Sequence, residues 1–154
     1  CLGAQLLAYA AGGDVEILQE EGSDQQLAEI GWDNIFPQSL DHKSKLITLL
    51  SQPFPALHWH SDRILLPTNA ELIASSRRCK EQLFSIGTLA YGVQFHVEID
   101  DKMIDNWIKE DKEFISAALG GDGQSILKQQ QKEFGQKTLD SRLEFLNILF
   151  DLLI

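Results

Sequence analysis

The chain has 154 residues, and its 13 basic and 23 acidic side chains give a formal net charge of −10 with a pI of about 4.7. Hydrophobic residues make up 44% of the chain and charged residues 23%, as in an ordinary globular domain. The acidic balance argues against binding to nucleic acid or to an anionic membrane, because there is no basic stripe to neutralise phosphates. No run of 18 apolar residues occurs, so no membrane-spanning helix is expected.

Length and cysteine usage predict one domain in a reducing compartment. A chain of this length suits a single core, and its two cysteines, Cys1 and Cys79, are too few for a secreted disulfide framework. No signal peptide is recognised, so we expect a cytoplasmic protein. The sequence starts at Cys1 and its single methionine is Met103, which favours a piece of a longer chain.

The first half of the chain alternates between helical and strand patterns. Leucines and alanines at helical spacing predict a helix that ends at a glycine pair, and later runs of alternating polarity predict strands. Prolines at 53 and 55 end a second, short helix. In chain order the expected elements are a helix at 2–13, strands at 14–18 and 29–35, a short helix at 42–52, and a strand–turn–strand unit at 56–67.

The second half is predicted to end in helices. Residues 69–80 favour helix or turn with Asn69 as the N-cap, and residues 81–99 favour two strands joined around Gly87. An amphipathic helix is expected at 100–119. A final helix is expected to turn one apolar stripe toward the core, made of Leu139, Leu143, Leu146, Phe150 and Leu153. This mixture of strands and helices predicts an α/β fold with a sheet covered by helices.

Residues 91–100, YGVQFHVEID, alternate between apolar and polar side chains like a half-buried strand. Such a strand would gather three polar side chains on the face opposite the core: Gln94, His96 and Glu98. A carboxylate beside an imidazole fixes the tautomer of the ring and leaves Nε2 as a base. The alternative is that these residues form the polar outer face of an edge strand.

Cys1 is the candidate nucleophile, because it directly precedes the first predicted helix. A thiolate at that position is stabilised by the helix dipole and by free N–H groups. Together with His96 and Glu98 it would complete a set of nucleophile, base and orienting carboxylate. Two alternatives are a terminal residue of no importance and an N-terminal-nucleophile hydrolase with the α-amine as base. The second alternative would not need His96 and Glu98.

Two histidines of the segment HWH, His58 and His60, share one face of a predicted strand and could bind a metal ion. No third ligand with suitable spacing is apparent, so we predict no metal site. Cys79 lies in a helix-like stretch and is interpreted as core or surface packing.

Four segments of the chain together resemble the class I (triad) glutamine amidotransferases. They are CLGAQL at 1–6, EIGW at 29–32, HWHSDRILLP at 58–67 and GVQFHVEI at 92–99. The pair formed by C-x-G-x-Q and a distant F-H-x-E is specific, although each motif alone would be weak. The chain is similar in particular to the stand-alone subfamily related to the amidotransferase domain of GMP synthase, over nearly its whole length.

This resemblance implies an open, mostly parallel α/β sheet flanked by helices, as in flavodoxin-like domains. Residues 1–154 would be the C-terminal part of one amidotransferase domain, without its N-terminal strands. The strand that precedes the nucleophile in the family, and the glycine-rich loop that supplies a second oxyanion donor, are absent from this sequence. No metal or organic cofactor is implied.

The resemblance also implies a role for each matching residue. Cys1 would attack the γ-carboxamide of glutamine and release ammonia, with His96 as general base and then acid, and with Glu98 as the partner that orients His96. The backbone N–H of Leu2 would be one oxyanion-hole donor. Four residues would bind the amino-acid end of the substrate: Gln5, His60, Ser61 and Asp62. Water would then hydrolyse the γ-glutamyl thioester, and ammonia would pass to a synthase or ligase partner.

Two other functions stay open at this point. A hydrolase of γ-glutamyl peptides or conjugates would use the same triad without a partner protein. A truncated, non-catalytic homologue would keep the sheet and only bind a partner. The sequence does not identify the ammonia acceptor, whether the partner is fused or separate, or the oligomeric state.

Overall fold

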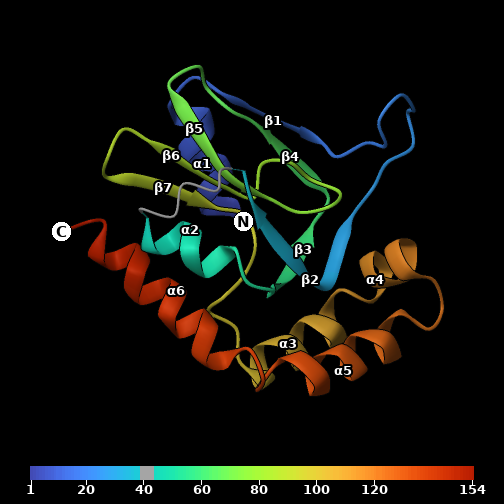
Figure 1. Ribbon diagram of the computed structural model, residues 1–154. Coiled ribbons are helices and arrows are strands. Elements are labelled where there is room, and N and C mark those ends of the chain that lie inside the picture. The colour runs from blue at the N-terminus through green and yellow to red at the C-terminus, as the bar shows by residue number, and fades with distance from the viewer. Residues whose placement is uncertain (39–43) are drawn as a thin grey trace.

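The computed structural model describes residues 1–38 and 44–154 (Figure 1). The elements are α1 (Leu2–Ala10), β1 (Asp14–Ile17), β2 (Glu29–Pro37), α2 (Lys45–Leu50), β3 (Phe54–His60), β4 (Asp62–Leu65), β5 (Ala70–Ser75), β6 (Leu83–Ile86), β7 (Ala90–Val93), α3 (Asp101–Glu110), α4 (Lys112–Leu119), α5 (Gly123–Phe134) and α6 (Leu139–Asp151). Figure 1 shows α1 behind the strands and the pair α2–α6 in front of them. The remaining helices, α3 to α5, form a group beside β2.

Every strand pairing among the described residues is antiparallel. β1 pairs with β4, and a five-stranded sheet has the order β3-β2-β5-β6-β7. The predicted mostly parallel sheet is therefore wrong for these strands. Tight connections, such as residues 87–89 between β6 and β7, can join only antiparallel neighbours, because a parallel pair needs a crossover of a dozen or more residues.

Residues 69–80, predicted as helix or turn, begin with the strand β5. Asn69 does not cap a helix but lies in the turn that a hydrogen bond from the Ala70 N–H to the Pro67 carbonyl closes. β5 then pairs with both β2 and β6. The segment AELIA has good helix propensity, but hydrogen bonding on both sides and the burial of Ala74 outweigh that local preference.

Among residues 1–38 and 44–154, the core consists of three groups of buried side chains. The rings of Phe54, Phe95 and Phe145 meet between the five-stranded sheet and the α2–α6 pair, with centroids 5.4–6.2 Å apart. A second group lies under α3, α4 and α5 around Trp32. The third group holds α1 against Phe84 of β6. The two helices next to the candidate site, α1 and α3, are therefore each anchored by a separate part of the core.

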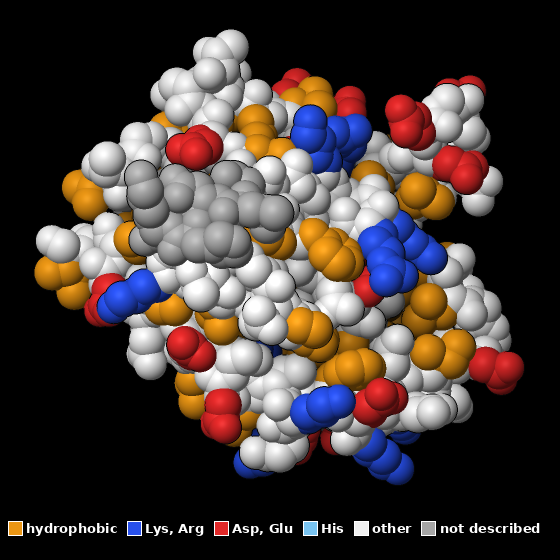
Figure 2. Space-filling view, viewed as in Figure 1, with side chains coloured by type: hydrophobic (Ala, Val, Ile, Leu, Met, Phe, Trp, Pro, Cys, Tyr) orange, Lys and Arg blue, Asp and Glu red, His pale blue; other side chains and the backbone are white. Residues whose placement is uncertain are grey.

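The apolar stripe predicted for the last helix is wrong. Three of its members are exposed, namely Leu143, Phe150 and Leu153, at 49%, 58% and 39%. The buried face of α6 instead carries Arg142, Phe145 and Ile148. Both sets follow helical spacing, and the second is selected because Arg142 finds hydrogen-bond acceptors in the interior. Figure 2 shows the side of the molecule seen in Figure 1, where exposed hydrophobic side chains are scattered in small groups between acidic and basic ones.

The helical part after residue 100 is more divided than expected. The helix predicted at 100–119 is interrupted at Asp111, which separates α3 from α4, and α5 follows after a glycine-rich turn. None of the helices in the described residues is long and apolar enough to cross a membrane.

The glycine of the EIGW segment allows α5 to approach β2. Gly31 has a φ of +101°, and a Cβ at this position would lie 2.4 Å from Oε1 of Gln130. That oxygen accepts a hydrogen bond from the Trp32 backbone N–H at 3.0 Å. The segment therefore needs glycine both for its backbone conformation and for the space that Gln130 occupies.

Candidate active site

Cys1 lies at the N-terminus of α1, as predicted. Its carbonyl oxygen accepts hydrogen bonds from the N–H groups of Ala4 and Gln5 at 3.0 and 3.2 Å, which makes it the N-cap residue. The half-buried thiol faces the Trp59 carbonyl oxygen on β3, with Sγ and oxygen 4.0 Å apart. The first turn of α1 directs free N–H groups toward this end of the helix, and the N–H of Leu2 is among them.

His96 lies outside the regular strand on which it was predicted. β7 ends at Val93, and His96 forms a single antiparallel bridge with Leu57 of β3, with N···O distances of 2.8 and 3.3 Å. The polar face of this segment is not a solvated edge, because Gln94 and His96 are 0% and 8% exposed. Gln94 donates a hydrogen bond from Nε2 to the Asp62 carbonyl at 3.0 Å. The segment is thus fastened to β3 and to the turn that follows it.

His96 and Glu98 are in direct contact. Nδ1 of His96 lies 2.7 Å from Oε1 of Glu98, and the other carboxylate oxygen accepts the Val97 N–H at 2.9 Å. A carboxylate accepts hydrogen bonds, so Nδ1 carries the proton. Nε2 of His96 is buried and has no hydrogen-bond partner among residues 1–38 and 44–154, and the Trp107 ring packs edge-on against the imidazole. The lone pair of a neutral imidazole is therefore available at Nε2.

Glu98 is held in its ionised form. Burial alone would raise its pKa, but the hydrogen bond with His96, the positive charge that His96 carries once it is protonated in acid, and the backbone N–H groups of Glu98 and Val97 lower it to about 2. The ionised carboxylate therefore stabilises the folded state above the ordinary pKa of 4.5, and this contribution is lost as the pH falls toward 2. At neutral pH, Glu98 is an anion.

A cavity of about 290 Å³ joins the four predicted substrate-binding residues to Cys1. Its lining comprises Cys1, Gln5, Trp59, His60, Ser61, Asp62, Asp111 and Phe114. His96 and Glu98 do not line it, and they are connected to Cys1 through the neighbouring strand. Leu57 bridges His96, and Trp59, two residues further along β3, faces the Cys1 thiol.

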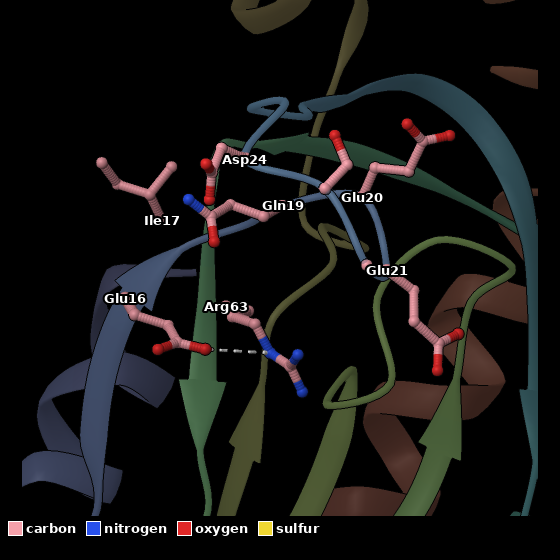
Figure 3. Close-up of a pocket in the computed structure, with 9 residues that line it drawn as sticks. Glu16, Ile17, Gln19, Glu20, Glu21, Asp24 and Arg63 are labelled. Atoms are coloured by element: carbon pink, nitrogen blue, oxygen red, sulfur yellow. Dashed lines mark ion pairs between the residues drawn. The ribbon is translucent and has the colours of Figure 1, made fainter.

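A second cavity, of about 500 Å³, contains none of the predicted site residues (Figure 3). It lies beside the acidic loop after β1, where Arg63 faces Glu16 at 3.9 Å across an open depression. Its lining has neither a thiol nor an imidazole. We therefore place the candidate active site at Cys1.

Sequence reasoning missed Arg142, which fixes the backbone on both sides of Glu98. This buried guanidinium donates hydrogen bonds to the carbonyls of Val97, Ile99 and Gly135 at 2.8–2.9 Å. It also lies over the Trp32 ring, 5.5 Å from the centroid. An arginine among leucines of an amphipathic helix looks solvent-exposed, so the sequence carried no signal for this role.

We expect Arg142→Leu to lower the free energy of unfolding by roughly 3 kcal/mol, because three buried carbonyls would lose a charged donor. Urea denaturation would measure this loss. The control is Lys137→Leu at an exposed position before the same helix, which we expect to change stability by less than about 0.5 kcal/mol. Equal stability of the two variants would contradict a structural role for Arg142.

Comparisons with known proteins identify the family of this chain. The sequence profile of the family "Glutamine amidotransferase class-I" matches residues 1–112. The glutamine amidotransferase-like protein YfeJ of Salmonella typhimurium is 29% identical over 120 residues, covering 78% of this chain and 47% of YfeJ. The GMP synthase [glutamine-hydrolyzing] of Borreliella burgdorferi is 28% identical over 144 residues, covering 89% of this chain and 26% of that protein.

Solved structures show the same fold. A glutamine amidotransferase from Methylobacillus flagellatus superposes with a TM-score of 0.76 at 23% identity, over 100% of this chain and 61% of that one. A glutamine amidotransferase from Thermotoga maritima gives a TM-score of 0.69 at 26% identity, over 97% and 60%. The chain thus spans about half of YfeJ, about a quarter of the GMP synthase and about three fifths of these two structures. Because the family profile covers more than two thirds of its length, the chain belongs to the class I glutamine amidotransferase family.

Proposed function

We propose that this protein hydrolyses the side-chain amide of glutamine through a cysteinyl thioester and delivers ammonia to a synthase or ligase partner. One observation carries the proposal: a buried His96 is held at Nδ1 by Glu98 at 2.7 Å and keeps Nε2 without a partner among the described residues. A general base needs this arrangement, because the held nitrogen fixes the tautomer and the other nitrogen takes the proton.

The proposed reaction uses Cys1 and His96 in two half-reactions. His96 Nε2 takes the thiol proton of Cys1, and the thiolate attacks the amide carbon of glutamine. The N–H of Leu2 donates a hydrogen bond to the oxyanion that forms. The tetrahedral intermediate collapses when His96 returns the proton to the leaving nitrogen, which departs as ammonia. Water, deprotonated by His96, then attacks the thioester and releases glutamate and the Cys1 thiol.

The cavity beside Cys1 is the proposed binding site for the amino-acid end of glutamine. Gln5 and the segment of His60, Ser61 and Asp62 line it, as expected from the resemblance. The Asp62 carboxylate supplies a charge that suits the α-ammonium group of the substrate. This side of the site is fixed, because the Asp62 carbonyl accepts hydrogen bonds from both His60 and Gln94.

The partner is proposed from the relatives. The Borreliella burgdorferi protein bears the name of a glutamine-hydrolysing synthase, and 26% of its length corresponds to this chain. We infer that this domain likewise produces ammonia and that another domain or protein consumes it in a synthase or ligase reaction. A cytoplasmic location stays a prediction from the sequence.

The test is a comparison of substrates with the full-length protein that contains these residues. We expect ammonia release from L-glutamine to exceed, in kcat/KM, the cleavage of a γ-glutamyl anilide or a γ-glutamyl dipeptide. Faster cleavage of the bulky conjugates would replace this proposal with a γ-glutamyl hydrolase. No turnover of either substrate, with candidate synthase partners added, would point to a non-catalytic homologue.

A further inference from the structure

Three buried side chains converge behind the wall of the active-site cavity. The antiparallel register of β2 and β3 places Glu29 directly opposite His60, and His58 follows on the same face of β3. Glu29 Oε2 lies 3.1 Å from His60 Nε2 and 3.6 Å from His58 Nδ1. All three side chains are at most 5% exposed, and one ligand atom from each lies within 4.8 Å of the others. The third ligand that the HWH segment lacked in sequence is therefore supplied by β2.

The hydrogen bonds of this cluster are incomplete. Neither ring nitrogen of His58 makes a hydrogen bond of good geometry among the described residues, although the side chain is 1% exposed, and its polar neighbours are the Glu29 carboxylate and the Asp33 backbone. Leaving a buried imidazole without partners is unfavourable, and such groups in folded proteins require an explanation.

His60 has the arrangement of a metal ligand. Its Nδ1 lies 2.9 Å from the Asp62 carbonyl, so Nδ1 carries a proton and Nε2 is directed at the Glu29 carboxylate. Metal-binding histidines characteristically donate the other ring N–H to a backbone carbonyl or a carboxylate. Without an ion, the contact with Glu29 needs a proton on Nε2, and a cation would take the place of that proton.

We propose that Glu29, His58 and His60 bind one zinc ion. Zinc bonds of 2.0–2.2 Å in tetrahedral geometry separate neighbouring ligand atoms by about 3.3 Å, and the two separations at Glu29 are close to this value. Two imidazoles and one carboxylate are a ligand set that zinc prefers over magnesium or calcium. The structure assigns the ion to the interface of β2 and β3, apart from the Cys1 thiol.

Gln82 is the fourth ligand in this proposal. Its amide nitrogen lies 2.6 Å from Glu29 Oε2 and 3.4 Å from His60 Nε2, and its Oε1 is buried without a partner among the described residues. Half a turn about the terminal bond of the side chain exchanges nitrogen and oxygen and directs Oε1 into the cluster. An ion at this position would then bind the free Oε1 of Gln82 and the free Nδ1 of His58 together.

The surroundings of the site support and admit an ion. The Ser76 hydroxyl donates a hydrogen bond to Oε1 of Glu29, which leaves Oε2 for the ion. A cavity of about 200 Å³ is lined by Glu29 and His58 and provides an entry path.

A zinc ion here would fix one wall of the active-site cavity. It would join β2, β3 and Gln82, which precedes β6. Its ligand His60 is followed directly by Ser61 and Asp62 of the cavity lining. The expected effect is on stability and on the position of this wall, since the ion touches neither Cys1 nor His96. The proposal therefore does not depend on glutamine hydrolysis.

The test is a titration of the chelator-treated full-length protein with cobalt(II) and zinc(II), in the absence of substrate. We expect one cobalt per chain, visible absorption typical of tetrahedral cobalt, and no thiolate-to-cobalt charge-transfer band. Zinc should displace the cobalt and raise Tm by about 5–10 °C. His58→Gln is expected to weaken binding by at least about 100-fold.

Cys1→Ser is the matched control, and we expect it to bind cobalt like the wild type, whatever its activity. Circular dichroism verifies that each variant is folded. Because His58→Gln could unfold the chain, X-ray absorption of the zinc-loaded wild type provides a second measurement, with only nitrogen and oxygen neighbours expected near 2.0–2.1 Å. A folded wild type that binds neither metal, binding that survives His58→Gln, or a sulfur neighbour of zinc would overturn the proposal.

Discussion

Cys1→Ala is expected to lower kcat for ammonia release from glutamine by at least about 10⁴-fold, with little change in substrate affinity. The sulfur is the only atom that forms a covalent bond to the substrate in the proposed reaction, and removal of a nucleophile in comparable triads costs this much or more. KM should change little, because the cavity that binds the amino-acid end is lined mostly by other residues. Steady-state assays of ammonia and glutamate would measure both constants.

The second cysteine of the chain is the matched control for Cys1. Cys79 is 1% exposed, and burial raises the pKa of its thiol to about 12, so it stays protonated. Cys79→Ala should therefore keep full activity. A glutamine analogue with an electrophilic γ-carbon should label Cys1 and leave Cys79 free. Activity that persists in Cys1→Ala would rule out the thioester and, with it, the proposed function.

His96→Asn is expected to lower kcat by about 10³- to 10⁴-fold. The backbone hydrogen bonds between position 96 and Leu57 do not involve the side chain, so asparagine keeps them. Asparagine offers no basic nitrogen to take the proton from Cys1. The double variant Cys1→Ala, His96→Asn should be no slower than Cys1→Ala alone, because residues that act as one unit are not additive. Additive losses would contradict a shared proton transfer.

Glu98→Gln provides a graded comparison with His96→Asn. We expect a smaller loss, about 10- to 100-fold, since this carboxylate orients His96 without touching the substrate and its side chain is 52% exposed. The amide can turn either oxygen or nitrogen toward Nδ1, so the tautomer of His96 would no longer be fixed. An equal loss in the two variants would mean that Glu98 takes part in proton transfer itself.

Some parts of this protein could be predicted because their signals are local. The helix after Cys1 forms from adjacent leucines and alanines and ends before the glycine pair, and the hairpin around Gly87 forms as expected. The contact between His96 and Glu98 was anticipated, but for an incomplete reason. The segment is no regular strand, and the two side chains meet because a bridge to Leu57 buries the histidine.

Other parts depended on which segments pack together. The buried face of α6 could not be chosen from spacing, because two sets of residues have helical spacing and only distant backbone carbonyls make Arg142 an interior residue. The strand β5 likewise forms from a segment with helix propensity, because β2 and β6 provide partners for its backbone. Local preferences of a few tenths of a kcal/mol per residue cannot decide such cases.

The sequence by itself determined the family, and its motifs gave the residues that we propose for the chemistry, because motifs record which side chains a reaction needs. Only the tertiary structure decided the antiparallel order of the strands and the meeting of Glu29 with His58 and His60. Contacts between residues about 30 positions apart depend on strand register, and no local pattern fixes that register. The strands were therefore predicted to be mostly parallel although the described pairs are antiparallel, and the contact of Glu29 with the two histidines was not predicted.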